Sequence, residues 1–275
     1  YRIQQSRNYD REIAEELEIS YGSVVTVLTD ILCVRRLAAK FVPKILNFQQ
    51  MSARREMSEL NLQAVAEDPR LLQRVITGDE SWVDIETNAQ STQLCSQGES
   101  RSKKHRQSRS NTKVLLTVFF DYKGIVFHEF LPPGSTVNKE YYREILRRLC
   151  ENVRSKRPEL WANRSWILHH DNAPAHTSLL ISDFLTKNSI STFPQPPYSP
   201  DLAPCDFFLF PRIKKNLKEQ RFETIEEIKR NSEEQLNSIP KDAFKRCFEE
   251  WERRWHKCIA AGGSYFEGNK NTLED

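Results

Sequence analysis

The sequence predicts an α/β domain in which a mixed β-sheet is flanked by helices, preceded by a short helical segment. From residue 73 onward, β-rich segments alternate with amphipathic ones in the order strand, two-strand hairpin, helix, strand, helix, strand, helix. That order is typical of a sheet covered by helices. The 275 residues, 38% of them hydrophobic and 29% charged, are enough to bury a core and indicate a globular protein.

Composition excludes several classes of protein. The net charge of +3, from 41 basic and 38 acidic residues, does not by itself imply a nucleic-acid partner. The six cysteines are scattered without a C-x-x-C pair, which argues against a zinc site and favours free thiols. The longest apolar stretch is far too short to span a bilayer, so no membrane partner is expected.

Two short helices joined by a turn are predicted within residues 10–32. Residues 20–22 form the expected turn, and Ser23 could cap the second helix. Such a pair is either a DNA-binding helix-turn-helix or an ordinary helical hairpin. The second helix contains no Lys or Arg, and the basic residues come after it. The candidate DNA contacts here are Ser23, Arg35, Arg36 and Lys40.

A second group of candidate DNA contacts lies in a long polar loop, predicted at about 85–112. Residues 101–113 contain six basic residues and no acidic one. A charge run of this kind is either a solvated loop or an arm that follows DNA phosphates. Its candidate contacts are Arg101, Lys103, Lys104, Arg106 and Arg109.

The remaining elements are short and regular, apart from a mostly helical connector at 46–72. They are a strand at 74–77, a hairpin of 113–121 with 125–131, a helix at 138–157, a strand at 166–169, a helix at 177–187, a strand at 191–193 and a helix at 207–220. The C-terminal part is helical, with Thr224 as a cap and an aromatic stripe within 241–261 that favours core packing.

Three aspartates are expected where strands or turns end, namely Asp79, Asp171 and Asp206. Mg²⁺ prefers oxygen ligands, and two such ions can activate a water or a 3′-hydroxyl for attack on a phosphodiester. Each aspartate could instead serve only to cap a turn. Asp201 competes with Asp206 as the third ligand, and Glu80 with Asp79 as the first.

Three histidines lie close to the second aspartate in the sequence, at positions 169, 170 and 176. Without a cysteine or a fourth ligand at suitable spacing, a zinc site is not expected. We expect these histidines to line the site or to orient Asp171.

Taken together, these motifs resemble those of mariner-type DNA transposases of the Tc/mariner superfamily. Residues 77–82 (TGDESW), 169–177 (HHDNAPAHT) and 198–208 (YSPDLAPCDFF) resemble the three catalytic segments of that family. Between Asp171 and Asp206 lie 34 residues, which matches the family's Asp-Asp-Asp triad and selects Asp206 over Asp201. Phe41, Val42 and Pro43 resemble the linker motif through which family members dimerise.

The resemblance implies an RNase H-like catalytic domain at 73–275, in which Asp79, Asp171 and Asp206 hold two Mg²⁺ ions, with Mn²⁺ able to substitute. It implies a nuclear enzyme that cleaves double-stranded DNA at transposon ends and joins it to TA target sites as a homodimer. Residues 85–112 would be the clamp loop, and 41–72 the linker. Residues 1–40 would hold the second helix-turn-helix, which binds the terminal inverted repeats.

The sequence is also compatible with two other functions. Family members usually carry a first helix-turn-helix before this point, so we expect roughly 60–80 residues to be missing, about the size of a small domain. A transposase-derived DNA-binding or assembly protein with impaired transposition is therefore an alternative. A nuclease of RNA/DNA hybrids shares the fold but accounts for neither the helix-turn-helix nor residues 41–43.

Overall fold

The chain is described here by a computed structural model that covers residues 9–32, 42–84, 113–132, 134–217, 222 and 224–266. It divides into two compact units, Tyr1–Val42 and Pro43–Asp275, and each is described by itself. None of the helices in these ranges combines the length and apolar composition needed to cross a bilayer.

In its described residues the first unit contains two short helices, α1 (Tyr9–Glu16) and α2 (Tyr21–Thr26), with a π-helical turn at Val27–Ile31 after them. The Ser20 side chain caps α2 by accepting a hydrogen bond from the Ser23 backbone N–H at 3.0 Å. The prediction that Ser23 is the cap is therefore wrong. The chain reverses earlier than expected, at Glu18, whose φ of 53° is left-handed, so α2 begins before Ser23.

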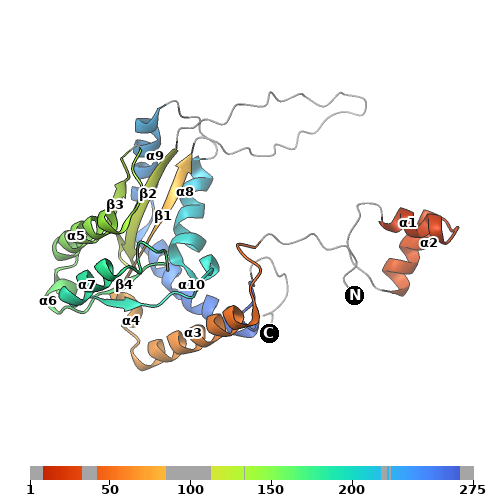
Figure 1. The fold of residues 1–275 in the computed structure, drawn as a ribbon, viewed down its shortest axis with the longest axis horizontal. Helices are drawn as coiled ribbons and strands as arrows, with labels where there is room; N and C mark the ends of the chain where they lie inside the picture. The colour runs from red at the N-terminus through yellow and green to blue at the C-terminus, as the bar shows by residue number, and fades with distance from the viewer. Residues whose placement is uncertain are drawn as a thin grey trace. The chain divides into compact units, whose positions relative to one another are not determined.

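The described residues of the second unit include a five-stranded sheet in the order β3-β2-β1-β4-β5, and β1 to β4 are labelled in Figure 1. The strands are β1 (Val75–Asp84), β2 (Lys113–Asp121), β3 (Gly124–Phe130), β4 (Ile167–His169) and β5 (Ser191–Phe193). β1 pairs antiparallel with β2 and parallel with β4, and β4 pairs parallel with β5. The sheet is mixed, as predicted, and the predicted hairpin is β2 with β3.

Helices cover both faces of this sheet (Figure 1). On one face lie α5 (Lys139–Lys156), α6 (Pro158–Ala162) and α7 (Leu179–Lys187); on the other lie α8 (Phe210–Leu217), α9 (Ile225–Asn237) and α10 (Lys241–Ala260). Because side chains alternate along a strand, Val75 enters one apolar cluster and Ile76 the other. The aromatic stripe of α10, including Trp251 and Trp255, is buried as expected.

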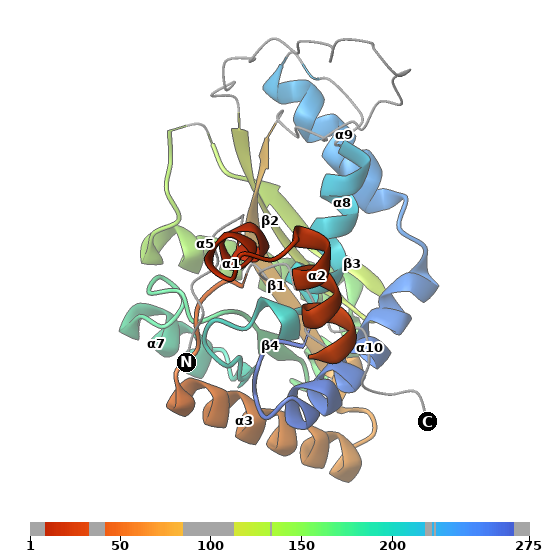
Figure 2. The same cartoon turned by 90° about the vertical axis from the view of Figure 1, so that its right-hand side faces the viewer.

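Residues 43–72 belong to this second unit rather than standing apart from it. They form α3 (Phe48–Glu67) and the first residues of the short α4 (Leu71–Arg74). The helix α3 begins at a capping box in which Asn47 and Gln50 each bond the other's backbone N–H. It packs alongside α10 (Figure 2), and Leu62 and Val65 contact the apolar cluster there.

Gly78 is required by a close approach between β1 and β2. It pairs with Phe119, whose side chain is fully buried. A Cβ atom at residue 78 would lie 2.1 Å from Cδ1 of that ring, which real structures do not allow. The glycine therefore lets β1 continue under the Phe119 ring and into Asp79.

Candidate active site

The three predicted aspartates come from separate elements that the sheet brings together, and we call them the triad. Thr77 of β1 pairs with His169 of β4 in parallel register. Asp79 and Asp171 each follow that pair by two residues, so both lie beyond the same end of the β1–β4 pairing. Asp206 lies in a π-helical turn (Cys205–Leu209) that contacts β1.

Asp79 does not lie at the end of a strand, and that prediction is wrong. β1 continues beyond the predicted strand at 74–77 to Asp84, and Asp79 pairs with Val118 in its middle. The antiparallel partner β2 runs along the whole segment and supplies ladder hydrogen bonds that outweigh the turn preference of Gly-Asp-Glu-Ser. A central strand is a rigid support for a carboxylate.

The triad carboxylates repel one another. Burial, and then the negative charges of Asp206 and Glu80, hold the pKa of Asp79 well above its usual range. Burial and the charge of Asp171 raise the pKa of Asp206 to about 6. Carboxylates that disfavour one another's ionisation in this way are stabilised by a cation placed among them.

Asp171 differs from the other two because the positive charge of His176 lies beside it and favours its ionised form. His176 Nδ1 donates to Asp171 Oδ1 at 2.6 Å, and His176 Nε2 lies 3.4 Å from Glu80 Oε2. Burial alone would lower the pKa of His176, but these two carboxylates outweigh it and raise the pKa to about 9. At neutral pH a buried imidazolium therefore bridges Asp171 and Glu80.

The other two histidines are neutral. Burial lowers the pKa of His170 to about 3, and its Nδ1 lies 2.8 Å from the Tyr142 hydroxyl. Burial also lowers the pKa of His169 to about 4. Of the three histidines, His176 is the one that orients Asp171. His169 is instead hydrogen-bonded to Thr77 and Gln195.

The donor set fits a hard divalent cation in its chemistry. All three triad ligands are carboxylates, which Mg²⁺ and Mn²⁺ favour. Beside them Glu80 Oε1 is buried without a hydrogen-bond partner among the described atoms. Among the described residues, however, no three His, Cys, Asp or Glu side chains surround one point closely enough to share a metal ion. In this structure Asp171 bonds His176 instead.

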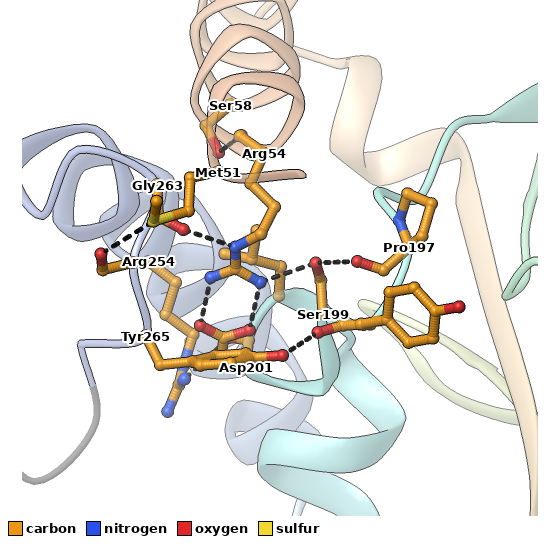
Figure 3. A network of polar contacts seen from close by, with 12 residues as sticks. Met51, Arg54, Ser58, Pro197, Ser199, Asp201, Arg254, Gly263 and Tyr265 are labelled. Atoms are coloured by element: carbon orange, nitrogen blue, oxygen red, sulfur yellow. Dashed lines mark hydrogen bonds and ion pairs between the residues drawn. The ribbon is translucent and has the colours of Figure 1, made fainter. Parts of the chain in front are cut away.

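Asp201, the competitor for the third ligand, is engaged elsewhere. Both of its carboxylate oxygens accept hydrogen bonds from the Arg54 guanidinium, at 2.8 and 2.7 Å (Figure 3). The Arg54 and Asp201 side chains are 0% and 3% exposed. A carboxylate bound this way has no role as a metal ligand, so the geometry favours Asp206.

Sequence reasoning missed Arg54, Tyr142 and Gln195. Their side chains are hydrogen-bonded to residues close in the sequence to the triad. Nothing in one sequence distinguishes a buried arginine from its neighbour Arg55, which is more than half exposed. Gln195 offered a weak signal, because a lone amide between prolines at 194 and 196 points to a constrained turn.

The predicted DNA contacts are only partly described. Ser23 is exposed on α2, and Val42 and Pro43 are exposed before α3. The other predicted contacts and the clamp loop lie outside the described residues; these are Arg35, Arg36, Lys40, Phe41, Arg101, Lys103, Lys104, Arg106, Arg109 and the range 85–112.

Comparison with known proteins gives a consistent set of relatives. Residues 84–163 match the family described as Transposase (partial DDE domain). The chain is 31% identical over 258 residues to the mariner Mos1 transposase of Drosophila mauritiana, covering 94% of this chain and 74% of that one. It is 29% identical over 257 residues to the human histone-lysine N-methyltransferase SETMAR, covering 94% of this chain and 37% of that protein.

Solved structures of the Mos1 protein share the fold. The Mos1 mariner paired end complex with Mn matches with a TM-score of 0.85 at 32% identity, covering 94% of this chain and 75% of that one. The Mos1 strand transfer complex matches with a TM-score of 0.83 at 32% identity, over 94% and 74%. The Mos1 catalytic domain matches with a TM-score of 0.70 at 32% identity, over 82% of this chain and all of that domain.

Proposed function

Because this chain belongs to the mariner family of DNA transposases, we propose that Asp79, Asp171 and Asp206 form the active site with which it cuts and joins DNA. Membership makes the chain a DNA transposase with an RNase H-like fold, whose cleavage and strand transfer depend on a divalent metal. One observation carries the assignment of the triad. Three carboxylates from β1, the end of β4 and a π-helical turn are close enough to shift one another's pKa.

Each carboxylate is held differently. Asp79 is fixed by the β1 ladder, and its Oδ1 accepts a hydrogen bond from the Glu80 N–H at 2.7 Å. Asp171 accepts from His176 and from the Ala173 N–H at 3.0 Å. Those bonds outweigh burial and lower its pKa, so Asp171 is ionised at neutral pH. The triad thus offers a partly preorganised set of oxygen ligands on a rigid frame.

We propose that the triad holds two divalent ions, Mg²⁺ or Mn²⁺. Such ions supply activation of an attacking water or 3′-hydroxyl and stabilisation of the leaving oxygen. Structures of the Mos1 protein with Mn and of its catalytic domain with Mg support this choice of ion. In the proposed reaction Asp79, Asp171 and Asp206 would hold the ions, and His176 would orient Asp171.

The substrate is proposed to be double-stranded DNA at transposon ends, joined to TA target sites. The paired-end and strand-transfer complexes of the Mos1 protein support DNA-end binding. We propose further that the chain acts in the nucleus as a homodimer, with residues 41–43 at the dimer linker and 85–112 as the clamp loop. Basic residues at 35–40 and 101–109 would contact DNA phosphates.

The proposed domain organisation is a helix-turn-helix within 1–40, a linker at 41–72 and a catalytic domain at 73–275. Division of the chain after Val42 supports a boundary close to residue 41. The packing of α3 on α10 supports a linker that is joined firmly to the catalytic domain. No observation on the described residues favours a DNA-binding or assembly protein without catalysis.

A cleavage assay tests the proposed active site. The purified chain and its Asp171→Ala variant would be incubated with nicked or pre-cut linear DNA in Mg²⁺ or Mn²⁺, which removes the need for end recognition. We expect metal-dependent cleavage or joining by the chain, and none by the variant. If the two proteins bind DNA equally and neither cuts nor joins it, the catalytic assignment is wrong for this chain.

A further inference from the structure

The loop that carries the third triad residue is anchored by one buried arginine. Arg54 of α3 is 0% exposed, and its guanidinium holds both oxygens of Asp201. It also donates to the Ser199 hydroxyl at 2.6 Å and to the Gly263 carbonyl at 2.8 Å. Figure 3 shows these bonds fanning out from the guanidinium, and the Tyr265 ring lies 4.7 Å from Arg54 Cζ.

A buried cation with this many partners fixes their relative geometry. Burying a charge is costly unless it is paired and hydrogen-bonded, so the loop must keep the arrangement that satisfies the arginine. The planar guanidinium also imposes directions that a single ammonium group cannot. Helix α10 holds the same stretch, because Arg254 donates to the Asp201 carbonyl and Trp251 to the Leu202 carbonyl.

From Ser199 a chain of buried hydrogen bonds leads towards the triad. Gln195 Nε2 donates to the Ser199 carbonyl at 2.7 Å, which leaves Gln195 Oε1 to accept from His169 Nε2 at 3.0 Å. His169 Nδ1 then accepts from the Thr77 hydroxyl at 2.8 Å. Asn172 Nδ2 adds a bond to the Gln195 carbonyl at 2.6 Å.

The far end of this series of hydrogen bonds involves residues that lie close in the sequence to all three triad residues. Thr77 is two residues before the first triad residue, and His169 is two residues before the second. Cys205, directly before the third, is buried and hydrogen-bonded to Thr77. One continuous network therefore joins α3 to side chains that stand one or two positions before each triad residue.

We propose that Arg54 is a positioning residue for metal binding: by anchoring residues 195–206 it sets the place of Asp206 relative to Asp79 and Asp171. The inference rests on the proposed function, because it requires the triad to be the metal site. It extends the active-site support to α3, a helix outside the sheet. Arg54 does not touch substrate or metal and acts through the loop.

A second buried ion pair provides a matched control. Arg157 donates to both oxygens of Asp121, at 2.5 and 2.8 Å, and the Asp121 side chain is fully buried. Asp121 ends β2, three residues beyond Val118, the strand partner of Asp79. Arg157 has the same chemistry as Arg54 but no link through hydrogen bonds to residues 195–206 among the described contacts.

The test compares Arg54→Lys with Arg157→Lys in the full chain. Thermal unfolding would report stability, titration with Mn²⁺ in the absence of DNA would report metal affinity, and cleavage of pre-cut DNA would report activity. We expect both variants to lower Tm. Only Arg54→Lys should weaken Mn²⁺ binding, by about tenfold or more, as loss of support behind metal ligands does elsewhere. Its cleavage rate at saturating DNA should fall in parallel.

Arg54→Lys that lowers Tm but binds Mn²⁺ as tightly as the unmodified chain would overturn the proposal and leave Arg54 a structural residue. If Arg54→Lys does not fold, Ser199→Ala removes one acceptor more gently. Weaker Mn²⁺ binding by Ser199→Ala supports the proposal, and unchanged binding overturns it. Asp206→Asn distinguishes failure of the proposed metal site from failure of the proposed role of Arg54. If it binds Mn²⁺ like the unmodified chain, the metal site itself is wrong; if it loses Mn²⁺ while Arg54→Lys does not, only the role of Arg54 fails.

Discussion

His176 Nδ1 lies 2.6 Å from Asp171 Oδ1, and the same imidazole lies 3.4 Å from Glu80 Oε2 through its other nitrogen. The pKa of His176 is raised from 6.5 to about 9 in the folded chain. The charge of His176 therefore contributes stability that is fully present below pH 6.5 and is lost as the pH rises through 9.

We predict that His176→Gln destabilises the chain below pH 6.5 by up to about 3 kcal/mol, because the variant lacks the positive charge of His176. The difference between the two proteins should shrink as the pH approaches 9.5. Urea unfolding of both proteins at pH 6 and pH 9.5 measures it. A difference that stays constant with pH would show that His176 is neutral at pH 6 and that the bridge is not ionic.

Asp206 should cost the folded chain stability at neutral pH. Burial and the charge of Asp171 raise its pKa from 3.8 to about 6, so folding opposes its ionised form. The penalty is absent below pH 3.8 and complete above about 6. Asp206→Asn should therefore raise stability by roughly 2–3 kcal/mol at pH 7 while abolishing cleavage.

Thermal unfolding of Asp206→Asn at pH 4 and pH 7 measures this effect, with Asp183→Asn on α7 as an exposed control. The gain should be present at pH 7 and nearly vanish at pH 4. Equal Tm values for Asp206→Asn and the unmodified chain at pH 7 would show that the folded chain does not disfavour the ionised form of Asp206.

Gly78 should tolerate no side chain. A Cβ there would lie 2.1 Å from Phe119 Cδ1, and that ring is fully buried. We expect Gly78→Ala to destabilise the second unit by about 1–3 kcal/mol through overpacking. Urea unfolding measures the change.

The double variant Gly78→Ala with Phe119→Leu is the control for that effect, since a smaller side chain at 119 makes room for the new methyl group. It should be more stable than the sum of the two single changes predicts. Strict additivity would show that the clash is relieved by backbone movement instead.

Much of the fold follows from local pattern. Alternation and turn residues predict β2 and β3, and helical spacing predicts α5 and α10. In these segments the apolar side chains recur at the regular spacing of a strand or a helix. The length of β1 was not predictable. Gly-Asp-Glu-Ser is typical of a turn, and only pairing with β2, more than thirty residues away, makes it a strand.

The candidate site was likewise only partly predictable from the sequence. Residue type and spacing bring out the three aspartates, and resemblance to a family selects Asp206 where chemistry alone left Asp201 open. Arg54 could not be found, because its burial depends on Asp201, 147 residues further along the chain. Long-range partners of this kind become visible only when the fold places them together.

The most direct test of the triad is an anomalous-scattering map from crystals of the chain soaked in Mn²⁺. The account predicts anomalous peaks bonded to carboxylate oxygens of Asp79, Asp171 and Asp206. Peaks at other residues, or none beside Asp206 in crystals that bind Mn²⁺ elsewhere, would contradict the assignment of these three aspartates as the catalytic metal site.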